Sequence, residues 1–238
     1  MRLPAPQHVE RISTGQVNDV WRITCAQESY LFKWLNAAEG LLLNREDELK
    51  LQSALAVQGL APQIIDSDYS RWVLQAFVEG PTLAQSQLPR TEKLTIMVGL
   101  MATLHQTRVD YLGPSFWQRL EGYFACASEQ QLARIHALQE QLTIDAAQSC
   151  LCHFDLSFDN IVLTERPVAL DWEYASFGNP AVDFASAMLI NRCSVAEQHD
   201  CFGEYRRRSP VPLKWDDVLA ALQLMQWVND IWYQLADD

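Results

Sequence analysis

The stretch 150–174 constrains this chain more than any other part of it. Two short apolar runs of strand length bracket a polar loop that carries His153, Asp155 and Asn160, and the second run ends at Asp171. Such a loop gathers several chemically competent side chains within a short length of chain. We therefore expect the functional chemistry to be concentrated here.

The loop residues carry oxygen and amide ligands. Asp155, Asn160 and Asp171 suit a Mg²⁺ ion that is shared with substrate phosphates better than they suit a soft transition metal. Their order also matches phosphoryl transfer, with a loop Asp near the attacking hydroxyl and a loop Asn and a later Asp on the metal. The structural alternative is two buried strands joined by an acidic turn.

The composite motif resembles a known group of proteins. His153-x-Asp155-x-x-x-x-Asn160, followed by the run 171–174 (Asp-Trp-Glu-Tyr), resembles the aminoglycoside phosphotransferase and choline kinase superfamily. In form it is most similar to choline, ethanolamine and thiamine kinases. The resemblance implies an α+β, protein-kinase-like fold with two lobes, a small β-rich one with one helix and a larger helical one. We expect residues 1–78 to form the nucleotide-binding lobe and 79–238 the catalytic and substrate-binding lobe.

The same resemblance implies ATP and Mg²⁺ as cofactors and gives the loop residues their roles. Asp155 is the expected catalytic residue, Asn160 and Asp171 are the metal ligands, and His153 braces the loop. Asp183 is expected to support the loop from the next helix, although a carboxylate at a helix start has an ordinary explanation too.

The residue after His153 departs from the family pattern. Phe154 stands where many members have Gly or Asn. We expect this change to affect the packing of the loop without removing an essential group.

Lys33 lies inside an apolar strand between Phe32 and Trp34, where an unpaired charge would be costly. The resemblance implies that Lys33 contacts nucleotide phosphates and is oriented by a helix glutamate. The family's Arg-Glu signature selects Glu46, with Glu48 as the alternative. A third possibility is that Lys33 extends its ammonium group to solvent from an edge strand.

Two further segments are expected to contact ATP. The small, polar turn 13–19 is predicted to cover the phosphates, or else to be an ordinary hairpin, since it holds a single glycine. The segment 75–78, with Gln75 and Phe77, matches the family's adenine-binding connection between lobes. A strand followed by a turn would produce the same pattern.

The last predicted helix, 214–235, is unusually aromatic. Because aromatic faces bind onium cations, at least one of Trp227, Trp232 and Tyr233 is a candidate for an acceptor cage, while core packing is the alternative. Glu173 could face a cationic substrate or be solvated.

The remaining helical and cysteine patterns have structural interpretations. An apolar stripe predicts a helix over 91–105, and His105 at its end is interpreted as a packing residue. The six cysteines show no paired Cys-x-x-Cys spacing, so we expect reduced thiols and neither a zinc site nor disulfides. Cys150 and Cys152 should share one face of a strand.

The composition narrows the possible partners. A net charge of −12 over 238 residues argues against nucleic-acid binding and is compatible with a small cationic substrate. The sequence has neither an apolar run of membrane-spanning length nor a signal-peptide core at its start, from which we expect a cytoplasmic protein. No pattern indicates an oligomeric state.

Together these observations predict an ATP- and Mg²⁺-dependent kinase that phosphorylates a hydroxyl of a small cationic metabolite. Thiamine is placed narrowly ahead of choline and ethanolamine. The alternatives are an aminoglycoside or sugar phosphotransferase, or a catalytically silent, kinase-like nucleotide-binding module.

Overall fold

The computed structural model describes residues 5–14, 18–26, 28–35, 44–110, 113–124, 127–145 and 148–236. The strands are β1 His8–Thr14, β2 Asn18–Thr24, β3 Ser29–Leu35, β4 Ile64–Ser67, β5 Trp72–Ala76, β6 Cys150–Cys152, β7 Ile161–Val162, β8 Val168–Ala169 and β9 Ser176–Gly178. The helices are α1 Arg45–Ala56, α2 Arg90–Gln106, α3 Phe116–Phe124, α4 Glu129–Leu142, α5 Pro180–Ile190, α6 Val195–Arg208 and α7 Trp215–Ala236.

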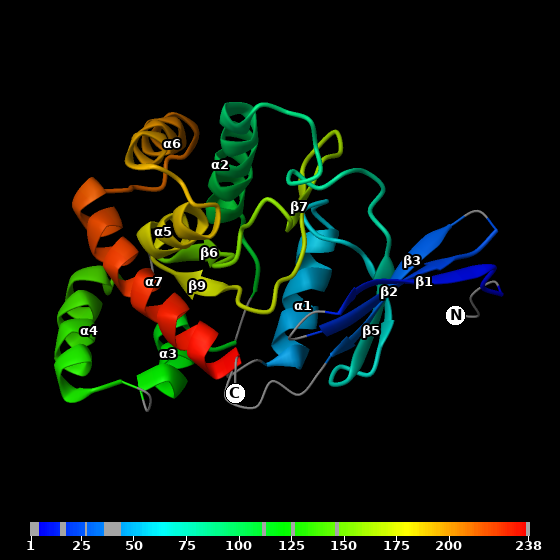
Figure 1. Cartoon of the computed structure of the whole chain (residues 1–238), viewed down its shortest axis with the longest axis horizontal. Coiled ribbons are helices and arrows are strands. Elements are labelled where there is room, and N and C mark those ends of the chain that lie inside the picture. Colours follow the sequence, from blue (N-terminus) through cyan, green and yellow to red (C-terminus); the bar gives the residue numbers. More distant parts are fainter. Residues whose placement is uncertain are drawn as a thin grey trace.

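The first five strands form one antiparallel sheet in the order β1-β2-β3-β5-β4. Aromatic pairs tie its middle together, because Phe32 lies 5.8 Å from Trp21 and 6.1 Å from Trp72 between ring centroids. Helix α1 lies beside this sheet, and the other helices are gathered on the opposite side of the molecule (Figure 1).

Helix α1 begins where Asn44 caps it, its side chain accepting a hydrogen bond from the Asp47 N–H at 3.2 Å. Acidic residues in the first turn favour this end of the helix dipole. The buried residues of α1 are Glu48, Leu49, Leu51, Gln52 and Leu55. A glutamate is therefore buried along with the apolar residues.

A short connection joins the sheet to the helical part. Leu163 N–H donates to the Pro81 carbonyl at 2.9 Å, and Leu83 N–H donates to the Ile161 carbonyl at 2.8 Å, so the connection lies against β7. Gly80 has φ 140°, and a Cβ there would lie 2.4 Å from the Leu163 carbonyl oxygen. Only glycine fits this close approach.

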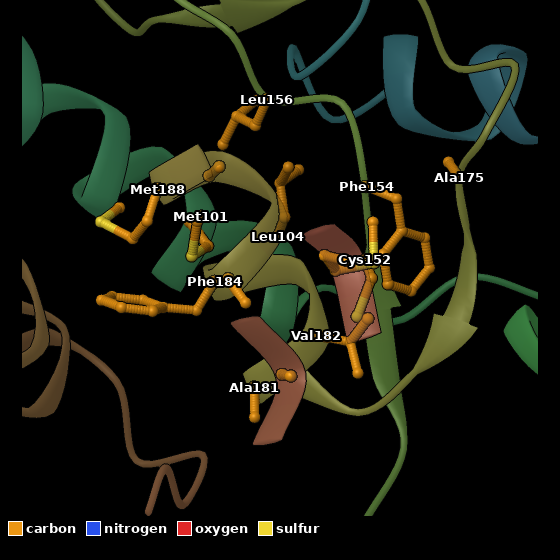
Figure 2. Close-up of a cluster of buried hydrophobic side chains, with 14 of the residues drawn as sticks. Met101, Leu104, Cys152, Phe154, Leu156, Ala175, Ala181, Val182, Phe184 and Met188 are labelled. Atoms are coloured by element: carbon orange, nitrogen blue, oxygen red, sulfur yellow. The ribbon is translucent and has the colours of Figure 1, made fainter. Parts of the chain in front are cut away.

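The larger core lies among α2, α5, α6, α7 and β6. Helix α5 is buried from Pro180 to Met188, and Asn179 caps it by accepting from the Ala181 N–H at 2.8 Å. Figure 2 shows Phe184 and Met188 of this helix with Met101 and Leu104 of α2. In the part of the chain that the structure describes, no helix is long and apolar enough to cross a membrane.

The two-lobed α+β architecture matches the prediction from sequence. The helices predicted over 91–105 and 214–235 are present as α2 and α7, with each end shifted by one residue. Strand β5 ends at Ala76, inside the segment 75–78 that is expected to connect the lobes. No prediction covered β9 or α6. Strand β9 has three residues, which is too short for a two-residue periodicity to be recognised.

Candidate active site

Lys33 and Asp171 form a partly buried ion pair between the sheet and the loop that follows β8. The Lys33 ammonium donates to Asp171 Oδ1 at 2.6 Å, and Lys33 is buried. Burial opposes its charge, but the carboxylate of Asp171 outweighs burial and raises the pKa of Lys33. Burial likewise opposes the charge of Asp171, yet Lys33 lowers its pKa. The lysine is therefore a paired group inside the protein, and it does not extend to solvent.

The assignment of Glu46 as the partner of Lys33 is wrong. Glu46 accepts from Lys50 at 2.6 Å, and its side chain is 58% exposed. Glu48 is 4% exposed, and its negative charge contributes to raising the pKa of Lys33. Two residues turn an α-helix by about 200°, so Glu46 and Glu48 point to opposite faces. Glu48, the alternative from sequence, occupies the buried face.

Arg45 links these carboxylates to a second acidic side chain. Its Nη1 atom donates to Glu48 at 2.8 Å and to Glu173 at 2.9 Å, and its Nη2 donates to Asn18 Oδ1 at 3.2 Å. Asn18 in turn donates to Glu173 at 3.3 Å. Glu173 is therefore buried and held by α1 and β2, so the alternative that it is solvated is wrong, while a role toward a cationic substrate remains a prediction.

The pKa of Glu173 is raised to about 7, first by burial and then by the negative charges of Asp171 and Glu48. Arg45 lowers it without offsetting those effects. The site thus holds more negative charge than its ion pairs neutralise.

Asp155 and Asn160 meet across the loop between β6 and β7. Asn160 Nδ2 donates to the backbone carbonyl of Asp155 at 2.9 Å and to its carboxylate at 2.8 Å. Burial, followed by the charges of Asp171 and Glu173, raises the pKa of Asp155 to about 8. A carboxyl group whose pKa lies near the working pH is suited to act as a general base.

The backbone of this loop is held from α5 and from β8. Asp183 Oδ1 accepts from the N–H groups of His153 at 3.1 Å and Phe154 at 2.6 Å. Nε2 of His153 lies 2.9 Å from the Leu170 carbonyl, which can only accept. These contacts are the bracing expected of Asp183 and His153.

Phe154 adopts φ 63°, a left-handed conformation that favours Gly or Asn. This explains why the family resemblance predicts those residues here. The Phe154 ring packs 4.7 Å from Phe116 between centroids, and Gly178 leaves it room, because a Cβ there would lie 2.8 Å from the ring. Aromatic packing and the two bonds to Asp183 hold the strained residue in place.

The side chains of the predicted adenine-binding segment have other partners. Gln75 is buried and accepts from Gln52 Nε2 at 2.8 Å. The guanidinium carbon of Arg22 lies 4.0 Å from the centroid of the Phe77 ring. The roles of Gln75 and Phe77 in ATP binding remain predictions.

Other predicted contacts fall partly outside the described residues. These include 15–17 in the predicted phosphate turn and the side chains of Trp232 and Tyr233, whose backbone belongs to α7. Trp227 is partly buried, with its ring 6.4 Å from that of Phe124 between centroids. Its indole nitrogen has no hydrogen-bond partner among the described residues. An acceptor cage in α7 remains a prediction.

The residues present fit a Mg²⁺ ion. Asn160 uses its amide nitrogen to hold Asp155, which leaves its amide oxygen as the group that could face a cation beside the Asp171 carboxylate. The carboxyl groups of Asp155, Asp171, Glu48 and Glu173 interact with one another here, against the two cations Lys33 and Arg45. A divalent cation bound to oxygen ligands would balance this charge.

Comparison with known proteins places this geometry in a family. The model of the phosphotransferase enzyme family matches residues 8–216, a range that includes all the loop and sheet residues described above. The chain belongs to the phosphotransferase enzyme family. The fold is therefore the protein-kinase-like one that the sequence predicts.

Individual relatives include choline and ethanolamine kinases. The chain is 28% identical over 165 residues to probable choline kinase 1 of Arabidopsis thaliana. The aligned region makes up 61% of this chain and 47% of that protein. It thus spans about half the length of that relative.

Solved structures share the fold over almost the whole chain. A choline kinase from Streptococcus pneumoniae has a TM-score of 0.77 at 19% identity, covering 98% of this chain and 85% of that one. An ethanolamine kinase from Plasmodium vivax also has a TM-score of 0.77, at 16% identity, covering 97% and 77%. The Streptococcus enzyme has also been solved in complex with AMP.

Proposed function

We propose that this protein is an ATP- and Mg²⁺-dependent kinase that phosphorylates a hydroxyl group of a small cationic metabolite. The observation that carries the proposal is the convergence of Lys33, Asp171, Asp155 and Asn160 from three separate chain segments. Family membership supports the same reaction class. The AMP complex of the Streptococcus choline kinase supports an adenine nucleotide as one substrate.

Asp155 is the residue proposed to act on the acceptor. Its carboxylate orients the acceptor hydroxyl and takes its proton as the oxygen attacks the γ-phosphorus of ATP. The bond between that phosphorus and the β–γ bridging oxygen breaks, and ADP leaves with the electron pair. Asn160 fixes the direction of the carboxylate through its 2.8 Å hydrogen bond.

Lys33 is proposed to position the phosphates of ATP. Its ammonium group is already fixed beside Asp171, and the carboxylates of Asp171 first, and then of Glu48, keep it charged. Arg45 holds Glu48 in turn, so that α1, β3 and the loop after β8 form one charged network. Because positioning and electrostatic stabilisation dominate phosphoryl transfer, this rigid network suits the reaction.

Asn160 and Asp171 would hold the Mg²⁺ ion. When bound, such an ion neutralises negative charge on the phosphates and stabilises the transferring phosphoryl group. The protein contributes the oxygen ligands and the fixed loop that presents them.

The acceptor is proposed to be cationic because the carboxyl groups of the site outnumber its cationic side chains, and an acidic site attracts a cation. Choline and ethanolamine come first, since the relatives described above are choline and ethanolamine kinases. Thiamine, favoured on sequence alone, has no relative among them and stays in the set of candidates. Because ATP is plentiful in the cytosol, we place the reaction there.

A substrate panel tests the proposal. Purified protein is incubated with ATP and Mg²⁺ and with choline, ethanolamine, thiamine, an aminoglycoside or an amino sugar in turn, and ADP formation is measured. We expect ADP to form in the presence of choline, ethanolamine or thiamine, and we expect the variant Asp155→Asn to lose this activity. Turnover of the aminoglycoside alone would contradict the choice of acceptor. A protein that binds ATP without turning over any of these compounds would favour the catalytically silent module.

A further inference from the structure

Two cysteines and a histidine form a buried cluster behind the catalytic loop. Cys150 and Cys152 lie on one face of β6, as their spacing predicts, with their Sγ atoms 3.8 Å apart. His105 at the end of α2 completes the cluster, and one ligating atom from each of the three residues lies within 4.8 Å of the others. Figure 2 shows Cys152 in the core, close to Phe154 and Val182.

The cluster can be reached from outside the core. His105 and Cys150 both line a cavity of about 1110 Å³, bounded also by the start of α5 at Asn179 and by the segment 210–214. Cys150, which lines the cavity, is the first residue of β6, whereas the catalytic loop begins after the last residue of β6, Cys152. An ion could approach the cluster without passing through the candidate active site.

The hydrogen bonds of His105 fix which ring nitrogen is free to bind an ion. Nε2 lies 2.9 Å from the carboxylate of Asp183, which can only accept, so this nitrogen carries the hydrogen in the neutral ring. Nδ1 then has the lone pair and accepts from the Tyr205 hydroxyl at 2.6 Å. Ser209 donates to the same hydroxyl oxygen at 3.3 Å, consistent with this direction.

We propose that Cys150, Cys152 and Nδ1 of His105 form a binding site for a soft or borderline divalent cation of the Zn²⁺ class. Thiolates and imidazole are the ligands that such ions prefer. Two sulfurs bound to a tetrahedral Zn²⁺ at about 2.3 Å lie about 3.8 Å apart, which is the spacing observed here. Water or an anion from the cavity would supply the fourth ligand.

The surroundings of the cluster support this assignment. A zinc-bound histidine usually donates its other ring N–H to a carboxylate, and Asp183 already occupies that position. The pKa of the Cys150 thiol is lowered, first by its hydrogen bond with Cys152 and also by the nearby His105, whereas burial raises the pKa of Cys152, so Cys150 is the thiol that ionises first. Binding displaces the Tyr205 hydroxyl from His105 and releases the two thiol protons to solvent through the cavity, so the weak thiol hydrogen bonds of Cys150 and Cys152 are lost. The bond from His105 to Asp183 persists.

The spacing of the cysteines gives no sequence signal for this site. Cys-x-Cys differs from the usual zinc-binding spacing, and the histidine comes from a helix far upstream, so the sequence argued against zinc. The site uses none of the residues that the proposed kinase reaction requires to touch a substrate. Its test is therefore independent of the acceptor.

The site is tested by titrating metal-free, reduced protein with Zn²⁺ by calorimetry and with Cd²⁺ by ultraviolet absorption of the metal–thiolate bond, both in excess Mg²⁺. We expect saturable binding of one ion with a thiolate absorption. The double variant C150S/C152S should lose both signals. The matched control C201S, which removes a buried thiol outside the cluster, should retain them.

Tyr205→Phe provides a second test, because it is expected to strengthen Zn²⁺ binding, whereas a general loss of structure would weaken it. Because the Tyr205 hydroxyl competes for Nδ1, removing it should tighten Zn²⁺ binding by about fivefold, the equivalent of one hydrogen bond. Circular dichroism verifies that each variant is folded. Absence of saturable binding at micromolar Zn²⁺, equal binding by C150S/C152S, or loss of binding in C201S would each overturn the proposal.

Discussion

The ammonium of Lys33 lies 2.6 Å from the carboxylate of Asp171, which joins the centre of the sheet to the helical part across 138 positions of the sequence. Lys33→Met leaves the partly buried Asp171 near Glu173 and Asp155 without its cation. We expect the variant to lose about 2 kcal/mol of unfolding free energy in urea and at least a hundredfold in kcat/KM. Lys50→Met, which breaks the exposed pair with Glu46, should change stability by less than about 0.5 kcal/mol. Equal effects of the two substitutions would contradict this role of Lys33.

Glu48 and Glu46 provide a matched pair on one helix. Glu48→Gln removes the buried charge that Arg45 contacts at 2.8 Å, so the positions of Arg45 and Lys33 are less well fixed. We expect kcat/KM to fall by about tenfold, equivalent to ~1.4 kcal/mol, with a raised KM for ATP. Glu46→Gln should remain within about twofold of the wild type, since the side chain is exposed. Steady-state kinetics with varied ATP distinguish the two variants. A larger loss in Glu46→Gln than in Glu48→Gln would restore Glu46 as the partner of Lys33.

These two glutamates also show what sequence reasoning could and could not find. The sequence predicts Asp155, Asn160, Asp171 and Lys33 as site residues, because motif spacing and a charge inside an apolar strand are visible in one dimension. Glu48 shares the buried face of α1 with Gln52 and Leu55, and the helical periodicity favoured it. The family signature selected Glu46 and overrode that signal.

Other features required three-dimensional information. Asn18 reaches Glu173 from 155 positions away, and Arg45 bridges two carboxylates that no local pattern connects. The burial of Glu173 follows from these contacts, whereas its sequence neighbours allow either a solvated or a buried side chain. The left-handed conformation of Phe154 was likewise hidden, because an aromatic residue gives no signal for positive φ.

Asp155→Asn should separate stability from activity. The pKa of Asp155 is raised from 3.8 to about 8 by burial and by nearby negative charge, so the folded protein holds this proton more tightly than the unfolded chain. Wild-type stability therefore falls as the pH rises from about 4 to 8, where this carboxyl ionises at a cost in the folded state. Asn has no proton to lose, and Asn160 can still donate to its side-chain oxygen.

We expect Asp155→Asn to stabilise the Mg²⁺-free protein by at least ~1 kcal/mol at pH 8, with a smaller gain at pH 5. Urea unfolding of both proteins across this range measures the difference. A gain that does not change with pH would show that the raised pKa is not its cause.

Gly178 should be indispensable to the packing of Phe154. A Cβ at Gly178 would lie 2.8 Å from the Phe154 ring, so Gly178→Ala forces the ring and its strained backbone to shift. We expect a loss of about 1–3 kcal/mol in unfolding free energy, as is typical of overpacking. Gly203→Ala is the control: it lies within α6, its nearest atom is 3.6 Å away, and it should be neutral or stabilising by up to ~1 kcal/mol. Comparable destabilisation by both would indicate that the ring contact is unimportant.

The most direct test of the proposed reaction follows the phosphoryl group itself. Wild type, Asp155→Asn and Glu46→Gln are incubated with Mg²⁺, the accepted alcohol and ATP labelled at the γ-phosphorus, and the label on the alcohol is quantified. The proposed function predicts transfer by the wild type and by Glu46→Gln, and a loss of at least about a thousandfold in Asp155→Asn. Undiminished transfer by Asp155→Asn would contradict the central role of this carboxylate.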